Sequence, residues 1–336
     1  MTPQTPPCEL LARQDADYRG WLWVAPPRDG WLESGEGAVW SADLSVCAAW
    51  AAAGRPAHSS LVPPTFAVPG AVLFWPKSHA LGAWWLEALC GALPAGTPIQ
   101  VVGETQGGIR RVPKTLAAMA LACRKLDNAR RCTLFETRAD DRATVPDTGW
   151  TSFEVAVAGV DGLTLATHPG VFGHGKLDDG TRLLLQALVD SPLATQGEAL
   201  DIGCGDGIIS AWLARRGWQV TASDISAFAV EAARRSLAAN GLRGQVCQSD
   251  VYDGVDGVFQ AIVSNPPFHQ ERAIDYDPTE RLIREAPARL QAGGSLTLVA
   301  NAFLPYPDWL TAAFGSFEVL ADDRRFRVYR AFKRRR

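Results

Sequence analysis

A glycine-rich turn at residues 201–207, Asp-Ile-Gly-Cys-Gly-Asp-Gly, restricts the fold more than any other feature of the sequence. It follows an apolar lead-in at Ala199 and Leu200, and apolar residues at helical spacing follow it between 208 and 213. This pattern predicts a strand, a tight turn and an amphipathic helix. A second predicted strand, 219–223, ends in Asp224, an acid that can accept hydrogen bonds from a ribose. The stretch therefore indicates an α/β unit that binds an adenosine-containing ligand.

The spacing of the glycines narrows the choice of ligand. A dinucleotide site uses Gly-x-Gly-x-x-Gly, but here Gly207 comes one residue early and Ile208 occupies the last glycine position. Asp201 opens the turn, where a carboxylate repels a pyrophosphate and attracts a cation. S-adenosylmethionine carries a sulfonium and an ammonium group. The turn therefore favours S-adenosylmethionine over a nicotinamide dinucleotide.

A second motif, Asn265-Pro266-Pro267-Phe268, follows the buried-strand pattern of 259–264. It is expected at the carboxyl end of a strand, where open α/β sheets bind their ligands. The two prolines remove two backbone donors and stiffen the chain, which leaves a rigid edge rich in acceptors. The Asn265 side-chain oxygen and the Pro266 carbonyl can each accept one N–H of an exocyclic amine, while Phe268 stacks on the ring. The motif therefore predicts methylation of a ring amine.

These residues resemble those of class I S-adenosylmethionine-dependent methyltransferases, specifically bacterial small-subunit ribosomal RNA guanine-N2 methyltransferases of the RsmC type. The similarity extends to most of the chain. It includes residues 169–172, 264–269 and 299–308, and in the first half 75–77, 101–104 and 129–132. The clearest departure from the family pattern is the segment 173–180.

The resemblance implies S-adenosylmethionine as cofactor, and ribosomal RNA or a small ribosomal subunit or its assembly intermediate as partner. It places Lys176 and Asp178 near the methionine end of the cofactor, and Asp250 with the Val251 backbone near the adenine. The expected catalytic residues are Asn265, Pro266, Pro267 and Phe268. The expected cofactor-binding residues are Lys176, Asp178, Asp201, Gly203, Cys204, Gly205, Gly207, Asp224, Ile225, Asp250, Val251 and Asn265.

An internal repeat predicts the domain organisation. Residues 39–45 are similar to 220–226, 71–79 to 261–269, and 93–96 to 290–293, in the same order. We expect two tandem Rossmann-like α/β domains, 1–145 and 146–336, each a mostly parallel seven-stranded sheet with helices on both faces and an antiparallel edge hairpin. The polar segment 140–149 is the expected linker. In the first copy, prolines at 26 and 27 replace the glycine turn and Trp75-Pro76-Lys77 replaces the acceptor edge, so we expect it to lack cofactor and chemistry.

RNA binding must depend on local patches, because the net charge is −3. The expected RNA-binding residues of the first domain are Arg110, Arg111, Lys114, Arg130 and Arg131. The basic C-terminal stretch 324–336 fits RNA contact and a solvated edge strand equally well.

Other classes of protein are less consistent with the sequence. No run of eighteen apolar residues occurs, the N-terminus does not resemble an export signal, and the seven cysteines are dispersed without a C-x-x-C pair. We therefore expect a cytoplasmic protein without metal or membrane. We also expect a monomer, a state that none of these features determines. Two alternatives stay open, a large-subunit ribosomal RNA guanine-N2 methyltransferase of the same build and a non-catalytic RNA-binding assembly factor.

Overall fold

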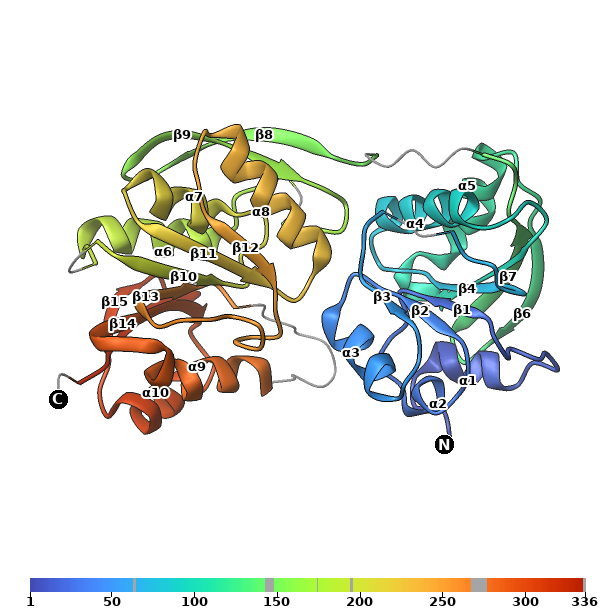
Figure 1. The fold of residues 1–336 in the computed structure, drawn as a ribbon, viewed down its shortest axis with the longest axis horizontal. Helices are drawn as coiled ribbons and strands as arrows, with labels where there is room; N and C mark the ends of the chain where they lie inside the picture. The colour runs from blue at the N-terminus through green and yellow to red at the C-terminus, as the bar shows by residue number, and fades with distance from the viewer. Residues whose placement is uncertain (63–64, 143–147, 174, 194–195, 267–276, 335–336) are drawn as a thin grey trace. The chain divides into compact units, whose positions relative to one another are not determined.

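The computed structural model describes residues 1–62, 65–142, 148–173, 175–193, 196–266 and 277–334 (Figure 1). The chain forms two compact units, Met1–Gly149 and Trp150–Arg336. The boundary predicted after residue 145 lies in the linker, of which 143–147 fall outside the described residues. Each unit contains a seven-stranded sheet, with order β3-β2-β1-β4-β5-β7-β6 in the first and β12-β11-β10-β13-β14-β16-β15 in the second. The orders are equivalent strand for strand, which confirms the predicted fold class.

The first unit has short strands at its centre. Its strands are β1 (Leu22–Val24), β2 (Ala38–Trp40), β3 (Ala57–His58), β4 (Ala71–Phe74), β5 (Pro98–Glu104), β6 (Arg124–Ala129) and β7 (Cys132–Arg138). Its helices are α1 (Pro6–Ala12), α2 (Gly30–Glu33), α3 (Leu44–Ala52), α4 (His79–Ala92) and α5 (Val112–Ala118), with 3-10 turns η1 (Thr105–Gly107) and η2 (Ile109–Arg111). Tryptophans supply much of its core, and Trp23, Trp40, Trp50, Trp75, Trp84 and Trp85 are all buried.

The second unit repeats this order of elements after an added hairpin. Its strands are β8 (Thr151–Val157), β9 (Val160–Thr167), β10 (Glu198–Ile202), β11 (Gln219–Asp224), β12 (Gln245–Gln248), β13 (Phe259–Ser264), β14 (Leu290–Asn301), β15 (Glu318–Asp322) and β16 (Phe326–Phe332). Its helices are α6 (Asp179–Asp190), α7 (Ile208–Arg215), α8 (Ala227–Ala239), α9 (Asp277–Arg289) and α10 (Tyr306–Phe314). In the sequence, segments 153–157 and 163–167 flank Gly159 and Asp161-Gly162, which predicts a hairpin, and the antiparallel pair β8–β9 confirms it.

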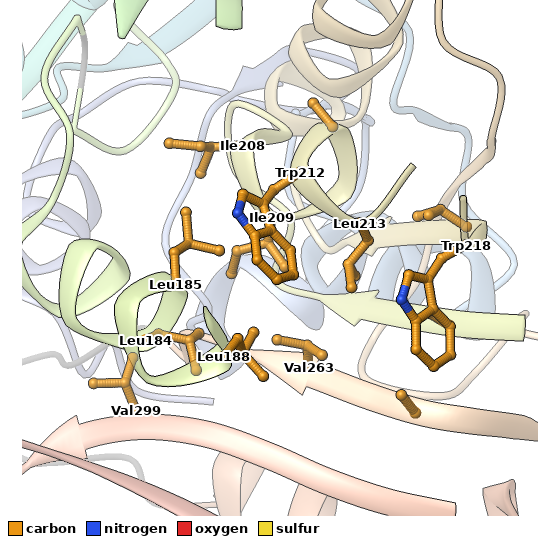
Figure 2. Close-up of a cluster of buried hydrophobic side chains, with 14 of the residues drawn as sticks. Leu184, Leu185, Leu188, Ile208, Ile209, Trp212, Leu213, Trp218, Val263 and Val299 are labelled. Atoms are coloured by element: carbon orange, nitrogen blue, oxygen red, sulfur yellow. The ribbon is translucent and has the colours of Figure 1, made fainter. Parts of the chain in front are cut away.

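Helices cover both faces of the second sheet. On one face, leucines of α6 and apolar residues of α7 pack against the sheet, with Trp212 buried among Leu184, Leu185 and Val263 (Figure 2). On the other face, Ile283 of α9 and Leu310 of α10 belong to a second buried cluster. Both faces of the central strands are therefore covered by apolar residues of helices, as is typical of parallel sheets. This packing holds the carboxyl ends of the strands at one edge.

One sequence-based expectation about the second sheet is wrong. In the sequence, the helical pattern of 279–290 is followed by Gly293-Gly294, which predicts the end of a helix before a strand at 295–299, but both glycines lie inside β14. There the pairing with β13 shifts register between Phe259 and Ala261. A side chain on Gly294 would lie 2.9 Å from the Gln260 carbonyl oxygen, so the glycine permits a close backbone approach at a bulge.

Candidate active site

The predicted site residues gather at the carboxyl edge of the second sheet. Strand β10 pairs in parallel with β11 on one side and with β13 on the other. Strands β11 and β12 therefore extend the sheet on one side of β10, and β13 and β14 extend it on the other. The loops that follow β10, β11 and β13 flank this change of strand order, a switch point where α/β folds bind ligands. The glycine turn follows β10, Asp224 ends β11, and Asn265 follows β13.

The three glycines of the turn have different functions. Gly203, Gly205 and Gly207 all have positive φ angles, of 73°, 54° and 82°. A side chain on Gly207 would lie 2.7 Å from the Ala233 Cα of α8, so this glycine allows close helix packing. A side chain on Gly205 would meet no atom of the described residues within 4 Å. Gly205 is therefore the glycine at which the turn faces open space.

Asp224 holds the glycine turn in place. Its Oδ2 accepts from the Gly205 amide at 3.1 Å, and its Oδ1 accepts from the Ser226 amide at 2.9 Å. The carboxylate therefore joins the turn after β10 to the start of α8. Ile225 lies between Asp224 and Ser226 in the sequence, and its carbonyl oxygen accepts from the Gln248 side chain at 2.9 Å. The backbone amides of Gly203 and Cys204 both donate to the Ser223 carbonyl, at 2.8 and 3.0 Å.

Two carboxyl groups of the glycine turn, those of Asp201 and Asp206, have pKa values well above the usual range of an aspartate. Asp201 is fully buried in β10, where its Oδ2 accepts from Ser210 and its Oδ1 has no hydrogen-bond partner within the described ranges. Burial raises the pKa of Asp201 to about 7, and the charges of Asp224 and Asp206 add to the effect. Burial likewise raises the pKa of Asp206 to about 7. The unpaired Asp201 oxygen and these acids suit a cationic ligand.

Asn265 has an unusual set of hydrogen bonds. Its Nδ2 donates to the Asp178 Oδ2 at 2.9 Å and to the Thr181 Oγ1 at 2.8 Å, while its buried Oδ1 has no partner among the described residues. Asp178 is also the N-cap of α6, because its Oδ2 accepts from the Thr181 amide at 3.0 Å. Buried acceptors without partners are rare, and a ligand N–H would satisfy this one.

The remaining predicted residues are less closely grouped. Lys176 is exposed. Asp250 forms an ion pair with Arg281 at 3.2 Å, and Val251 has a positive φ of 55°. Pro266 is buried next to Asn265. Pro267 and Phe268 lie outside the described residues. Within the described ranges, no group of three His, Cys, Asp or Glu side chains is arranged to hold a metal ion.

Sequence reasoning missed three residues at this edge. Thr181 and Asp206 lie close to predicted residues, and the spacing Asp178-x-x-Thr181 is a helix N-cap signal that could have indicated the first. Phe303 follows β14 and is 68% exposed, which is unusual for a phenylalanine. No local pattern in the sequence indicates that the Phe303 side chain is exposed rather than buried in the core.

The predicted RNA-binding residues lie at the carboxyl edge of the first sheet. Arg110 and Arg111 are in η2, and Lys114 is in the first turn of α5. All three side chains are exposed. Arg130 and Arg131 form the turn between β6 and β7, and the Arg131 carbonyl accepts from the Thr105 amide at 2.8 Å. Arg130 forms an ion pair with Glu9 at 3.2 Å. The sequence around Arg130 does not indicate this pair, because Glu9 lies near the other end of the unit in the sequence.

Comparisons with known proteins agree with this geometry. The Methyltransferase small domain family matches residues 162–330, and the Methyltransferase small domain N-terminal family matches residues 32–153. The chain is 64% identical to Ribosomal RNA small subunit methyltransferase C of Chromohalobacter salexigens, over 100% of both chains. It is 44% identical to the protein of the same name from Yersinia pestis, over 77% of this chain and 73% of that relative.

A solved structure is similar over nearly the whole chain. It is the T. thermophilus 16S rRNA N2 G1207 methyltransferase (RsmC) in complex with AdoMet and guanosine, with a TM-score of 0.85 and 26% sequence identity. The match covers 98% of this chain and 92% of that chain. The fold and the site define an S-adenosylmethionine-dependent methyltransferase with two tandem α/β domains. The chain belongs to the RsmC-type family of small-subunit ribosomal RNA methyltransferases.

No helix in the described part of the chain is long and apolar enough to cross a membrane.

Proposed function

We propose that this enzyme transfers a methyl group from S-adenosylmethionine to the exocyclic N2 amine of a guanine in 16S ribosomal RNA. The observation that carries the proposal is the buried Asn265 Oδ1 beside the glycine turn, which has no hydrogen-bond partner in the part of the chain that the structure describes. The relatives named above support the choice of RNA. Incubation with labelled S-adenosylmethionine and separated ribosomal subunits tests it. Label in the small subunit is expected, and label confined to the large subunit favours the alternative enzyme of the same build.

The site residues fit the cofactor. Asp224 at the tip of β11 suits the ribose hydroxyls, and Gly205 lets the ligand approach the backbone closely. By family resemblance, Asp250 and the Val251 backbone lie near the adenine. Lys176 and Asp178 lie near the methionine end of the cofactor. When bound, the sulfonium supplies an activated methyl group, so the protein need only align nitrogen, carbon and sulfur.

The acceptor edge prepares the amine. An amine conjugated to a ring is a poor nucleophile because its lone pair is delocalised. The Asn265 Oδ1 accepts one N–H and the Pro266 carbonyl accepts the other, which turns the lone pair toward the methyl donor. Phe268, outside the described residues, is proposed to stack on the guanine. The base must leave its stack to reach this edge, which favours unpaired RNA.

Cofactor affinity is expected to depend on pH. Burial raises the pKa values of Asp201 and Asp206 to about 7, so both carboxyls are protonated below that pH and ionised above it. A cationic ligand favours the ionised forms, so affinity should rise as pH increases through about 7 and then level off. Calorimetric titration between about pH 6 and 8.5 checks this, because that range spans the raised pKa values of the two carboxyls. An affinity that falls with pH over this range contradicts the assignment.

The first unit is proposed to be a degenerate copy that recognises RNA and supports the catalytic unit. Pro26 and Pro27 have no amide hydrogen to offer a cofactor. Asp29 is buried and already accepts from the amides of Thr5 and Trp31, at 2.8 and 3.0 Å. Trp75 follows β4 as Asn265 follows β13, and a side chain on Gly82 would lie 2.6 Å from its ring. An indole therefore fills the position of the acceptor.

The repeat also requires one correction to the sequence alignment of the copies. The alignment paired Asp43 with Asp224, but Asp43 is the N-cap of α3, whereas Ser226 is the N-cap of α8. Ser41 accepts from the Asp43 amide at 3.2 Å, as Asp224 accepts from the Ser226 amide at 2.9 Å. The first copy therefore has a serine where the second has the acid proposed to bind ribose.

Replacing Arg110, Arg111 and Lys114 with alanine should weaken RNA binding. The three exposed cations are proposed to contact phosphates, so each lost contact should reduce the salt slope of binding by about 0.7–0.9. Filter binding at several salt concentrations measures the slope, and calorimetry should show unchanged cofactor affinity. Arg19→Ala is a matched control, because that arginine is already paired with Asp17 at 2.6 Å. An unchanged slope in the triple variant would show that Arg110, Arg111 and Lys114 do not contact RNA phosphates.

We further propose that the enzyme acts in the cytoplasm as a monomer. Gel filtration with light scattering tests the second part, and a stable dimer contradicts it.

A further inference from the structure

We propose that Thr181 is a positioning residue for methyl transfer, and that with Asp178 it holds the Asn265 amide with Oδ1 toward the target amine. Thr181 lies in the first turn of α6 and is 5% exposed. It is 84 residues from Asn265 in the sequence. The inference rests on the proposed function and identifies what makes the acceptor edge selective for an N–H donor.

The two hydrogen bonds of the Asn265 amide nitrogen fix the orientation of the group. A primary amide has two donor hydrogens on nitrogen and an acceptor on oxygen. Both hydrogens are used, one by the Asp178 Oδ2 at 2.9 Å and one by the Thr181 Oγ1 at 2.8 Å. A rotated amide would place its oxygen against the Asp178 carboxylate, and the partial negative charge of that oxygen would be repelled by the carboxylate, with no hydrogen between the two acceptors. The amide oxygen is therefore the group that faces away from α6.

Asp178 alone does not account for this orientation. Its Oδ2 is shared between the Asn265 amide and the backbone amide of Thr181, which it caps at 3.0 Å. A single shared acceptor leaves rotation of the amide loosely restricted. The Thr181 hydroxyl provides a second acceptor, and two fixed partners determine the plane of the group.

The unpaired Oδ1 makes this restriction necessary. A buried acceptor without a partner loses the hydrogen bonds it makes in water, so an unrestricted amide would rotate to find a donor. The hydrogen bonds that the Asn265 amide donates to Asp178 and Thr181 prevent that rotation and keep the acceptor available. Small displacements of a positioned group strongly reduce turnover. The hydroxyl of Thr181 therefore acts on the reaction through Asn265.

Thr181→Val and Thr181→Ser separate positioning from packing. Valine has the shape of threonine without the hydroxyl, whereas serine retains it. We expect Thr181→Val to lower kcat about 10-fold, the equivalent of one hydrogen bond, with KM for S-adenosylmethionine within about 2-fold. Thr181→Ser should retain kcat within about 2-fold. Thr115→Val is the matched control, since that buried threonine of α5 donates to the Arg111 carbonyl at 3.2 Å in the other unit.

A double-mutant cycle with Asn265→Ala tests the inference directly. If Thr181 acts through Asn265, Thr181→Val should cause no further loss of kcat when Asn265 is already alanine. An equal loss in both backgrounds overturns the inference, because Thr181 then affects kcat independently of Asn265. Normal kcat in Thr181→Val with reduced kcat in Asn265→Ala overturns the inference alone. Normal kcat in Asn265→Ala overturns the proposed function together with it.

Discussion

Asn265→Ala is expected to lower kcat by ~100-fold or more while cofactor affinity stays nearly unchanged. The substitution removes the buried acceptor that is proposed to align the reacting amine. The Gly205 backbone and the Asp224 carboxylate, which are proposed to bind the cofactor, are not altered. Single-turnover kinetics give the rate of methyl transfer, and calorimetry gives the affinity for S-adenosylmethionine.

The same experiment needs a control for the fold. Asn265 donates hydrogen bonds to Asp178 and Thr181, so its loss also removes one donor from each of these two acceptors. A melting temperature close to that of the wild type shows that the unit still folds. Turnover close to that of the wild type shows that the acceptor edge has been assigned wrongly.

Asp224→Ala is expected to weaken cofactor binding by roughly 1–3 kcal/mol, because it leaves the ribose hydroxyls without a charged acceptor. The structure adds a second reason, since the lost carboxylate also accepts from the amides of Gly205 and Ser226. Calorimetric titration with S-adenosylhomocysteine measures the loss.

Ser41→Ala is the matched control for this substitution. Ser41 accepts from the amide two residues ahead in the first unit, as Asp224 does in the second. Its replacement should leave cofactor affinity unchanged. Unchanged affinity in Asp224→Ala, with catalysis lost, identifies a different acid as the ribose acceptor.

Local patterns were sufficient to predict the central part of the fold. Apolar runs placed β10, β11 and β13, and the glycine turn placed the start of α7, because strands and glycines carry strong local signals. The repeat predicted that the two units share one topology, and their strand orders are equivalent. Gly293 and Gly294 were misread because a glycine pair ends a helix and permits a bulge equally well.

Contacts between distant residues could not be predicted from the sequence. The hydrogen bond from Asn265 to Asp178 joins residues 87 positions apart, and no local pattern indicates it. The same is true of the pairing of Arg130 with Glu9. The raised pKa of Asp201 also depends on burial that only the packed sheet creates, whereas the sequence suggested an acid at the mouth of the turn.

The most direct test of the central claim is the identity of the methylated nucleoside. Small ribosomal subunits lacking the modification are incubated with the enzyme and S-adenosylmethionine, and the 16S ribosomal RNA is digested and analysed by mass spectrometry. An acceptor edge that binds an exocyclic amine predicts N2-methylguanosine, formed by the wild-type enzyme and strongly reduced with Asn265→Ala. Methylation of a ring nitrogen, a ribose or another base, or no methylation of 16S ribosomal RNA, would contradict the account.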